Sequence, residues 1–297
     1  MTHPELTITT LFETDDLLVR RGSAPDQTGV PLVIFSCAQL NAISGEWLEF
    51  YGFAAKSRRP VIWVTDKARS WFGAPGLADA ATKAILTELS VIGAPRVDTL
   101  GGSMGGYGAV AFSRRLPVRR AVAFVPRFSA DPTRVRDFRL RDHLMAYRTS
   151  TPFPAITEGL GHAERTLILH GNRGVDLLHI TAFPDLPNVW HQIMPGAKHN
   201  VAPSLKAKDM LTPLLRAALG GPDAKLRETL AKIDTRPLSE MRQELLLDRD
   251  DWIEKQRPKP LWLKVIRAPL SVFDGLRSKR SAKPARVGAL TRKGVKV

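Results

Sequence analysis

A glycine-rich stretch around one serine, DTLGGSMGGYGAV at residues 98–110, holds the residue types that most directly suggest chemistry. It follows a short apolar run and opens a segment of helical character. A Walker phosphate loop ends in Gly-Lys-Ser/Thr, and the stretch contains no lysine, so that interpretation is excluded. A dinucleotide fingerprint placed on residues 106–111 would lie inside the helix. It would also lack the acidic residue that holds a ribose about 20 residues later, so it is disfavoured.

The segment Gly101-Gly102-Ser103-Met104-Gly105 matches instead the G-x-S-x-G pattern of a nucleophile elbow. In such a turn the serine occupies the apex between a strand and a helix, and larger side chains two positions away on either side would collide. The N-terminus of the following helix points its free N–H groups at the place where an oxyanion would form. The pattern therefore predicts that Ser103 is a nucleophile; a structural glycine turn is the alternative.

A serine nucleophile needs a base, and the base needs an acid that orients it. With this kind of elbow the chain order is serine, acid, histidine, the last two following later strands. Asp176 comes after an apolar strand that ends at Gly171, and His199 comes after the next strand, in a loop before a helix. We therefore predict a Ser103–Asp176–His199 triad.

Other interpretations of these residues stay open. Asp176 would also suit the N-cap of a short helix, and His199 could be an ordinary loop histidine. Asp185, a nearby acid in a less regular turn between Pro184 and Pro187, and Asp131, which follows the preceding strand, are further candidates for the acid.

Short apolar segments alternate with helical ones over the first 220 residues. The predicted strands are Leu6–Phe12, Asp16–Arg20, Val30–Ser36, Pro60–Thr65, Val97–Leu100, Ala121–Val125, Thr166–Leu169 and Val189–Met194. The predicted helices among them are Glu46–Ala55, Leu77–Val91, Met104–Leu116 and Leu205–Leu219. This pattern predicts an α/β fold: a mostly parallel eight-stranded sheet with helices on both faces and an antiparallel hairpin at its first edge.

Two regions depart from the alternation. Residues 127–164 form a long polar connection between two strands, which is typical of a lid or binding region or of a surface helix and loop. We expect the main domain to span 1–220 and a helical, basic extension to span 221–297, with a disordered end.

The net charge of +15 is concentrated in the tail. Residues 255–297 contain thirteen Lys or Arg and one acid, which gives +12 and leaves +3 for the rest of the chain. We therefore expect the tail, and not the main domain, to bind an anionic membrane surface or another polyanion. A solubilising tail is the alternative, and no specific nucleic acid is predicted.

The remaining composition indicates a cytoplasmic protein without cofactor or metal. The single cysteine, Cys37, cannot form an internal disulfide, and neither a signal peptide nor an apolar run of membrane-spanning length is present. No histidine or cysteine cluster has the spacing of metal ligands. We expect a location in the cytoplasm, with attachment at the inner membrane face through the tail.

The run Gly101–Gly108, the strand Leu167–Gly171 followed by Asp176, and the segment Pro195–His199 resemble the α/β-hydrolase superfamily, over roughly residues 25–220. The resemblance implies a serine hydrolase, an esterase or deacylase, that cleaves an ester, thioester or amide through an acyl-enzyme. Its substrate would be a small-molecule, glycan or lipid ester.

Three further segments are similar to a little-characterised bacterial group of such proteins associated with surface polysaccharide production. They are Phe35-Ser36, Tyr51-Gly52-Phe53, and Asp66 followed by Trp71-Phe72-Gly73. The alternative that follows is a non-catalytic or acyltransferase protein of the same fold in a membrane-associated assembly.

Two departures from the superfamily pattern accompany the resemblance. The acid usually lies three residues after the glycine that ends its strand, a position occupied here by Gly174. The usual His-Gly oxyanion loop after the third strand is replaced by Ser36-Cys37-Ala38-Gln39. We expect the Met104 N–H to be one oxyanion donor and the N–H of Cys37 or Ala38 to be the second.

Overall fold

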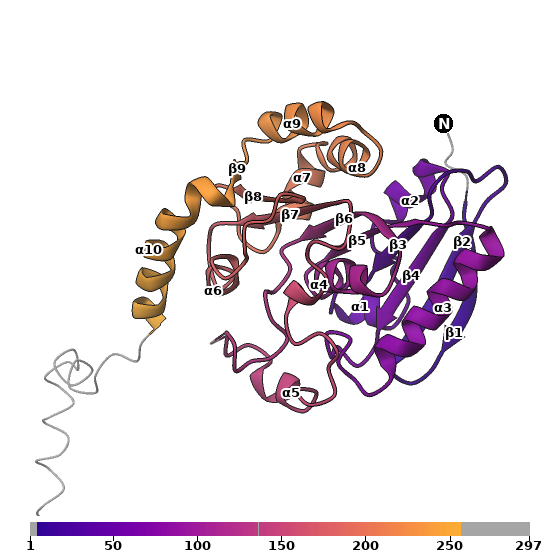
Figure 1. Ribbon diagram of the computed structural model, residues 1–297, viewed down its shortest axis with the longest axis horizontal. Helices are drawn as coiled ribbons and strands as arrows, with labels where there is room; N and C mark the ends of the chain where they lie inside the picture. The colour runs from indigo at the N-terminus through magenta and orange to yellow at the C-terminus, as the bar shows by residue number, and fades with distance from the viewer. Residues whose placement is uncertain (1–4, 136, 257–297) are drawn as a thin grey trace, which may run out of the picture. The chain divides into compact units, whose positions relative to one another are not determined.

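The computed structural model describes residues 5–135 and 137–256, and its centre is one nine-stranded sheet (Figure 1). The strands are β1 (Thr7–Glu13), β2 (Leu17–Ser23), β3 (Leu32–Phe35), β4 (Val61–Asp66), β5 (Val97–Gly102), β6 (Val118–Phe124), β7 (Arg165–Gly171), β8 (Val189–Met194) and β9 (Arg236–Pro237). They follow the order β1-β2-β4-β3-β5-β6-β7-β8-β9 across the sheet. Pairing is parallel from β4 through β8 and antiparallel at both edges, which confirms the mostly parallel sheet.

The helices connect these strands and extend the chain beyond them. They are α1 (Leu40–Ile43), α2 (Tyr51–Ser57), α3 (Leu77–Ile92), α4 (Met104–Ala111), α5 (Arg141–Met145), α6 (Leu177–Ile180), α7 (Val201–Ala207), α8 (Leu211–Leu219), α9 (Asp223–Lys232) and α10 (Leu238–Gln256).

Helices cover both faces of the sheet, because successive side chains of a strand point to opposite sides. On one face, Val33 and Phe35 of β3 belong to a core that includes residues of α3 and α4. On the other face, Leu32 and Ile34 belong to a core that includes residues of α2, α7 and α8. A strand that is buried on both faces has no polar alternation, which is why the continuous apolar runs of the sequence predicted this layering.

The two edges of the sheet differ in how well the sequence predicted them. The first two strands form the expected antiparallel hairpin. The ninth strand, Arg236–Pro237, pairs with Gln192 and Ile193 of β8 and was not predicted. Two polar or cyclic residues carry no apolar periodicity, so the number of strands had to be corrected from eight to nine.

Three predicted helices differ from the structure by more than one residue. The helix expected over Met104–Leu116 ends at Ala111. The segment predicted as one helix over Leu205–Leu219 is two helices, α7 and α8, because Asp209 between them has a φ of 55°. A residue in this left-handed region interrupts a right-handed helix. The helix expected over Glu46–Ala55 begins only at Tyr51.

One compact unit extends to Trp252. The compact unit therefore continues past residue 220, where the sequence placed the end of the main domain. Leu226 of α9 and Leu245 of α10 explain the difference, since each is buried in one of the two cores beside the sheet. The predicted disorder of the tail concerns residues outside the described ranges. None of the described helices is long and apolar enough to cross a membrane.

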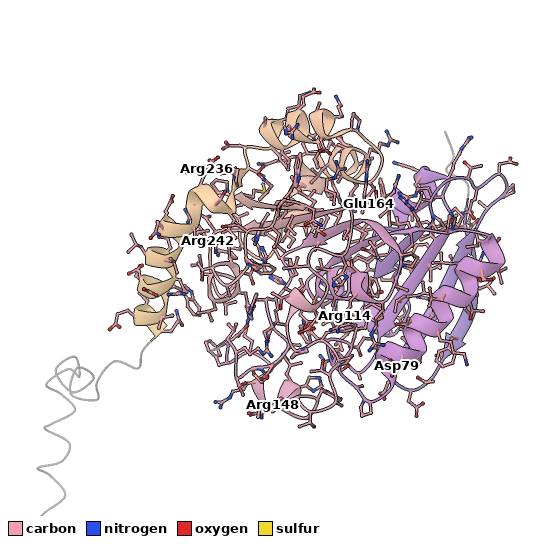
Figure 2. All side chains as sticks on the ribbon, viewed as in Figure 1. Asp79, Arg114, Arg148, Glu164, Arg236 and Arg242 are labelled. Atoms are coloured by element: carbon pink, nitrogen blue, oxygen red, sulfur yellow. The ribbon has the colours of Figure 1, made fainter. Side chains whose placement is uncertain are left out.

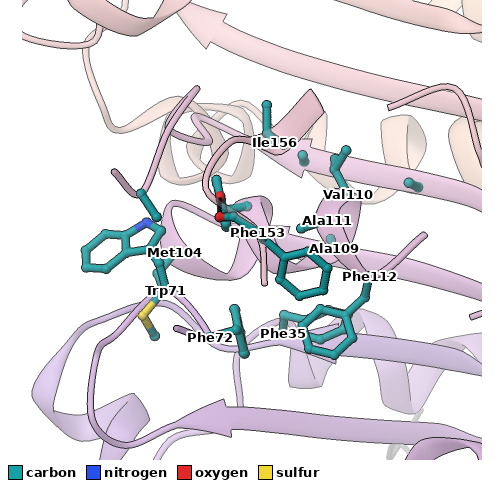
Figure 3. Close-up of a cluster of buried hydrophobic side chains, with 14 of the residues drawn as sticks. Phe35, Trp71, Phe72, Met104, Ala109, Val110, Ala111, Phe112, Phe153 and Ile156 are labelled. Atoms are coloured by element: carbon teal, nitrogen blue, oxygen red, sulfur yellow. Dashed lines mark hydrogen bonds between the residues drawn. The ribbon is translucent and has the colours of Figure 1, made fainter. Parts of the chain in front are cut away.

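The long connection between β6 and β7 contains α5 and contributes residues of both halves to the core, Ala130 and Leu144 among them. Phe153 and Ile156 are buried in the same cluster as the apolar side chains of α4 (Figure 3). The Tyr107 hydroxyl of α4 donates a hydrogen bond to the carbonyl oxygen of Phe153. This part of residues 127–164 is therefore a packed element of the domain, and its expected role as a lid stays a prediction.

Candidate active site

Ser103 lies at the sharp turn between β5 and α4, with φ 54° and ψ −115°. Such a backbone conformation is rare for a residue with a side chain and costs on the order of 1–3 kcal/mol. The flanking glycines permit the turn. A Cβ at Gly101 would lie 2.2 Å from the carbonyl carbon of Gly105, and a Cβ at Gly105 would lie 1.9 Å from the carbonyl oxygen of Phe35. The small residues on both sides of the serine thus have the steric role that their spacing predicted.

His199 follows β8, in the loop before α7, and its ring connects the serine to the acid. Its Nε2 lies 3.0 Å from Ser103 Oγ, and its Nδ1 lies 3.0 and 2.9 Å from the two carboxylate oxygens of Asp176. Because an ionised carboxylate only accepts, Nδ1 carries the proton and donates a hydrogen bond to Asp176. The Nε2 lone pair is then directed at the serine hydroxyl, which donates. The structure therefore brings the three predicted residues into one hydrogen-bonded relay.

The acid of this relay is buried and the base is open to solvent. The side chain of Asp176 is 6% exposed and that of His199 is 44% exposed. Burial disfavours the ionised form of Asp176, but the hydrogen bond from His199 and the charge of Arg139 outweigh it, so the pKa of Asp176 lies below its ordinary value. The Asp176 side chain makes no capping hydrogen bond to α6, although its backbone occupies the N-cap position.

The two other candidate acids interact elsewhere. Asp131 Oδ2 lies 3.4 Å from Arg148 Nε, and Asp185 Oδ1 accepts a hydrogen bond from Arg242 Nη2 at 2.8 Å. Figure 2 labels both arginines. Of the carboxylates in the described residues, Asp176 is the one within hydrogen-bond distance of His199.

A second layer of charged side chains, which sequence reasoning missed, lies against the acid. Asp137 accepts hydrogen bonds from Arg139 at 2.8 Å and from His179 at 3.1 Å, and it forms an ion pair with Arg127 at 3.2 Å. Arg139 Nη2 also lies 3.7 Å from Asp176 Oδ1. Burial opposes the ionisation of Asp137, but these partners hold its pKa well below the usual range. In the sequence Asp137 belongs to a stretch of mixed charges that looks like any polar surface.

The predicted oxyanion donors are not equivalent. Within the described residues, the N–H groups of Met104, at the start of α4, and of Ala38 have no protein hydrogen-bond acceptor. The Cys37 N–H donates to Glu49 Oε2 at 2.7 Å, so the prediction of Cys37 as a possible oxyanion donor is corrected. Burial raises the pKa of the Cys37 thiol to about 12, which keeps it protonated and unreactive.

The loop after β4 is strained and lies beside the elbow. Trp71 and Phe72 have φ values of 55° and 61°, which are unusual for bulky residues. Asp66 holds them, because its Oδ2 accepts hydrogen bonds from the Ser70 hydroxyl at 3.0 Å and the Phe72 N–H at 2.9 Å. The Arg127 guanidinium lies 5.0 Å from the centre of the Trp71 ring. Trp71 thus connects the strained loop to the long connection, within the cluster shown in Figure 3.

Two buried histidines outside the relay, His170 and His191, have structural hydrogen bonds. His170 Nε2 donates to the Pro126 carbonyl oxygen at 2.8 Å, and its Nδ1 accepts from His191 Nε2 at 2.8 Å. Burial lowers the pKa of His170 to about 4, so the ring is neutral at pH 7. In residues 5–135 and 137–256, no group of three or more His, Cys, Asp or Glu side chains is arranged to hold a metal ion.

Neither a protein-family model nor a curated protein matches the chain, whereas solved structures do. A chain of a glycosylation-associated protein complex from Streptococcus agalactiae has a TM-score of 0.53 and 15% identity, over 72% of this chain and 47% of that one. This chain thus spans about half the length of its neighbour. An α/β-hydrolase fold protein from Chitinophaga pinensis has a TM-score of 0.46 and 12% identity, over 74% and 99% of the two chains. A serine hydrolase from Cycloclasticus zankles has a TM-score of 0.47 and 12% identity, over 73% and 98%.

The strand order and the turn after β5 define the fold class. An antiparallel first pair, a parallel centre with β4 and β3 exchanged, and a strained serine between strand and helix are the features of the α/β-hydrolase fold. The chain has this fold, as the sequence predicted.

Proposed function

We propose that this protein is a serine hydrolase, an esterase or deacylase that cleaves an ester, thioester or amide through an acyl-enzyme. One observation carries the proposal: the Ser103 hydroxyl, the His199 ring and the Asp176 carboxylate form a continuous relay at 2.9–3.0 Å. The strained turn at Ser103 supports the same chemistry, as do the N–H groups of Met104 and Ala38, which have no acceptor in the part of the chain that the structure describes.

The chemistry begins with attack of Ser103 Oγ on the carbonyl carbon of the substrate. His199 Nε2 takes the hydroxyl proton as the new C–O bond forms, and Asp176 stabilises the resulting imidazolium through Nδ1. The carbonyl oxygen becomes an oxyanion that the N–H groups of Met104 and Ala38 are free to bind. His199 then gives the proton to the leaving group, whose bond to the acyl carbon breaks.

Water then hydrolyses the acyl-enzyme, with water as the nucleophile and Ser103 as the leaving group. His199 Nε2 removes a proton from a water molecule, which attacks the acyl carbon, and returns it to Ser103 Oγ as the acyl–enzyme bond breaks. The exposure of His199 gives water direct access to the base.

A fluorophosphonate probe tests the proposal, because such probes react with serines that a neighbouring base activates. We expect labelling of the wild-type chain and its loss in Ser103→Ala. Ser204→Ala is the matched control, since Ser204 on α7 is half-buried like Ser103 and has no part in the relay. Equal labelling of wild type and Ser103→Ala would refute the assignment.

Acyl transfer to another hydroxyl is the second candidate function, and the 44% exposure of the His199 side chain favours it. An open base admits the hydroxyl of a large acceptor as readily as water. The neighbour from Streptococcus agalactiae belongs to a glycosylation-associated complex, which makes a glycan hydroxyl the acceptor to try first. If the acyl-enzyme formed from an activated acetyl ester is consumed faster when an oligosaccharide is added, transfer is supported; an unchanged rate supports hydrolysis.

We further propose that the basic segment 255–297 binds anionic membrane lipid and holds the protein at the inner membrane face. Its charge of +12 supports this role, since each Lys or Arg near an anionic surface contributes about 1 kcal/mol.

A further inference from the structure

One buried acid has no part in the relay and lies next to the nucleophile turn. Glu49 is 8% exposed and occupies the segment between α1 and α2. Its backbone is fixed, because Trp63 Nε1 donates a hydrogen bond to its carbonyl oxygen at 3.0 Å. An acid is rarely buried in this way without a specific partner, so its contacts are informative.

The Glu49 carboxyl bridges the two segments that carry the candidate oxyanion donors. Its Oε2 accepts the Cys37 N–H at 2.7 Å, in the loop after β3. Its Oε1 lies against Gly102, where an added Cβ would be only 2.8 Å away. Gly102 lies two residues before Met104, and Cys37 directly precedes Ala38, so one carboxyl group contacts the backbone shortly before each of these two N–H groups.

We propose that Glu49 is a positioning residue that sets the distance between the Ala38 and Met104 N–H groups and so shapes the oxyanion site. The inference rests on the proposed function. By accepting the Cys37 N–H, the carboxyl fixes the backbone of the residue that directly precedes Ala38. By packing on Gly102, it fixes the turn that leads to Met104. A side chain at position 102 would displace the carboxyl, because its Cβ would lie 2.8 Å from Glu49 Oε1.

The protonation state of Glu49 decides how well this arrangement serves an oxyanion. Burial raises the pKa of Glu49 to about 8, although the hydrogen bonds from the Cys37 N–H and thiol lower it. The Cys37 thiol is the one titratable group among the described residues whose contact affects this carboxyl, and it stays protonated because its own pKa is about 12. Below pH 8 the carboxyl is therefore neutral. Above pH 8 it places a negative charge beside the site where the negative oxyanion forms, which slows the reaction.

Two variants separate the effect of the hydrogen bond that Glu49 accepts from the effect of its negative charge. The assay measures the rate of Ser103 phosphonylation from pH 6 to 9.5. Glu49→Gln mimics the neutral carboxyl, with one acceptor oxygen and no charge. We expect it to match wild type within about threefold at pH 7 and to exceed it by up to about tenfold at pH 9, where only about one-tenth of Glu49 remains protonated. Glu49→Leu removes the acceptor and should be slower by about tenfold or more at every pH.

The control is Glu88→Gln, a buried glutamate on α3 that pairs with Arg21 at 2.8 Å and not with Cys37 or Gly102. It should follow the wild-type pH profile. If Glu49→Gln and wild type have the same profile, the inference is overturned while the proposed function stands. If no Ser103-dependent labelling occurs in wild type, the proposed function fails and the inference fails with it. Should Glu49→Leu not fold, as thermal unfolding would reveal, the Glu49→Gln comparison still decides.

Discussion

At the scale of single residues, a serine hydroxyl becomes a nucleophile only when a base and an acid lie within reach. Ser103 has both, although His199 is 96 positions away in the chain. The acid differs in environment from the base, because Asp176 is buried and receives hydrogen bonds while His199 faces solvent. The hydrogen bonds from His199 favour the ionised form of Asp176 despite its burial, and the exposed ring of His199 is accessible to a substrate.

Replacing the acid tests which carboxylate orients His199. Asp176→Asn keeps the shape of the side chain but favours the wrong tautomer of His199, so we expect the rate of Ser103 acylation to fall by about 10³- to 10⁴-fold. Asp185→Asn and Asp131→Asn should stay within a few-fold of wild type, since their carboxylates pair with Arg242 and Arg148. A large loss in either of these two variants, with activity retained in Asp176→Asn, would contradict the relay.

Glu49 should also make stability depend on pH. Its pKa is about 8 in the folded chain against an ordinary value of 4.5, so between these values the folded state holds a proton that the unfolded state has released. The free energy of unfolding therefore falls as pH rises from 4.5 to 8, by up to about 1.4 kcal/mol per pH unit.

The side chain at position 49 of the Glu49→Gln variant cannot titrate. The free energy of unfolding of this variant, relative to that of wild type, should therefore increase as pH rises from 4.5 to 8. Urea denaturation at pH 5, 7 and 9 measures the difference. Asp66, whose pKa burial raises to about 6, is present in both proteins and cancels. Parallel stability curves for the two proteins would show that Glu49 ionises normally.

At the scale of elements, the elbow depends on how closely α4 approaches the ends of β3 and β5. Gly105 meets the carbonyl oxygen of Phe35, and Gly106 meets that of Phe124, at distances that leave no space for a methyl group. The helix N-terminus can reach the serine turn because these positions lack side chains. The glycines in and beside the G-x-S-x-G motif are therefore also packing residues.

Gly105→Ala tests this packing. A Cβ 1.9 Å from a backbone oxygen forces the helix away from β3, and we expect a loss of about 3 kcal/mol in the free energy of unfolding together with loss of Ser103 labelling. Gly52→Ala on α2 is the control. Nothing lies within 4 Å of the added methyl group, so it should stabilise the chain by about 0.5–1 kcal/mol. A Gly105→Ala chain as stable as wild type would disprove the close contact.

At the scale of the whole molecule, the compact unit and the basic segment have separate expected tasks. The compact unit reaches Trp252 and contains the complete relay, and the +12 charge lies in residues 255–297. Chemistry and surface attachment should therefore be separable by truncation.

Deleting residues 257–297 tests this separation. The shortened chain should keep its melting temperature and its Ser103 labelling, since the compact unit ends before the cut. It should lose sedimentation with vesicles of anionic lipid, an interaction that in the full chain weakens as salt is raised. Undiminished vesicle binding after truncation would show that the surface of the compact unit, and not the tail, binds the lipid.

Local patterns in the sequence determined a large part of this fold and of the candidate site. Apolar runs such as that of β3 must be buried on both faces, and the G-x-S-x-G spacing with Asp176 and His199 in order suffices to nominate three residues. The two-residue β9 and the break at Asp209 could not be predicted, because neither has a periodic signal of its own.

Only the tertiary structure decided which groups meet. Three acids were candidates in the sequence, and the fold brings Asp176 to His199 while it pairs Asp131 and Asp185 with arginines. Likewise, Cys37 and Ala38 were equal candidates for the second oxyanion donor in the sequence. In the fold, Glu49, 12 residues after Cys37, accepts the Cys37 N–H and leaves Ala38 as the candidate. Residue types and spacing constrain neighbours along the chain, but the contacts that select one donor or one acid come from distant segments that the sheet brings together.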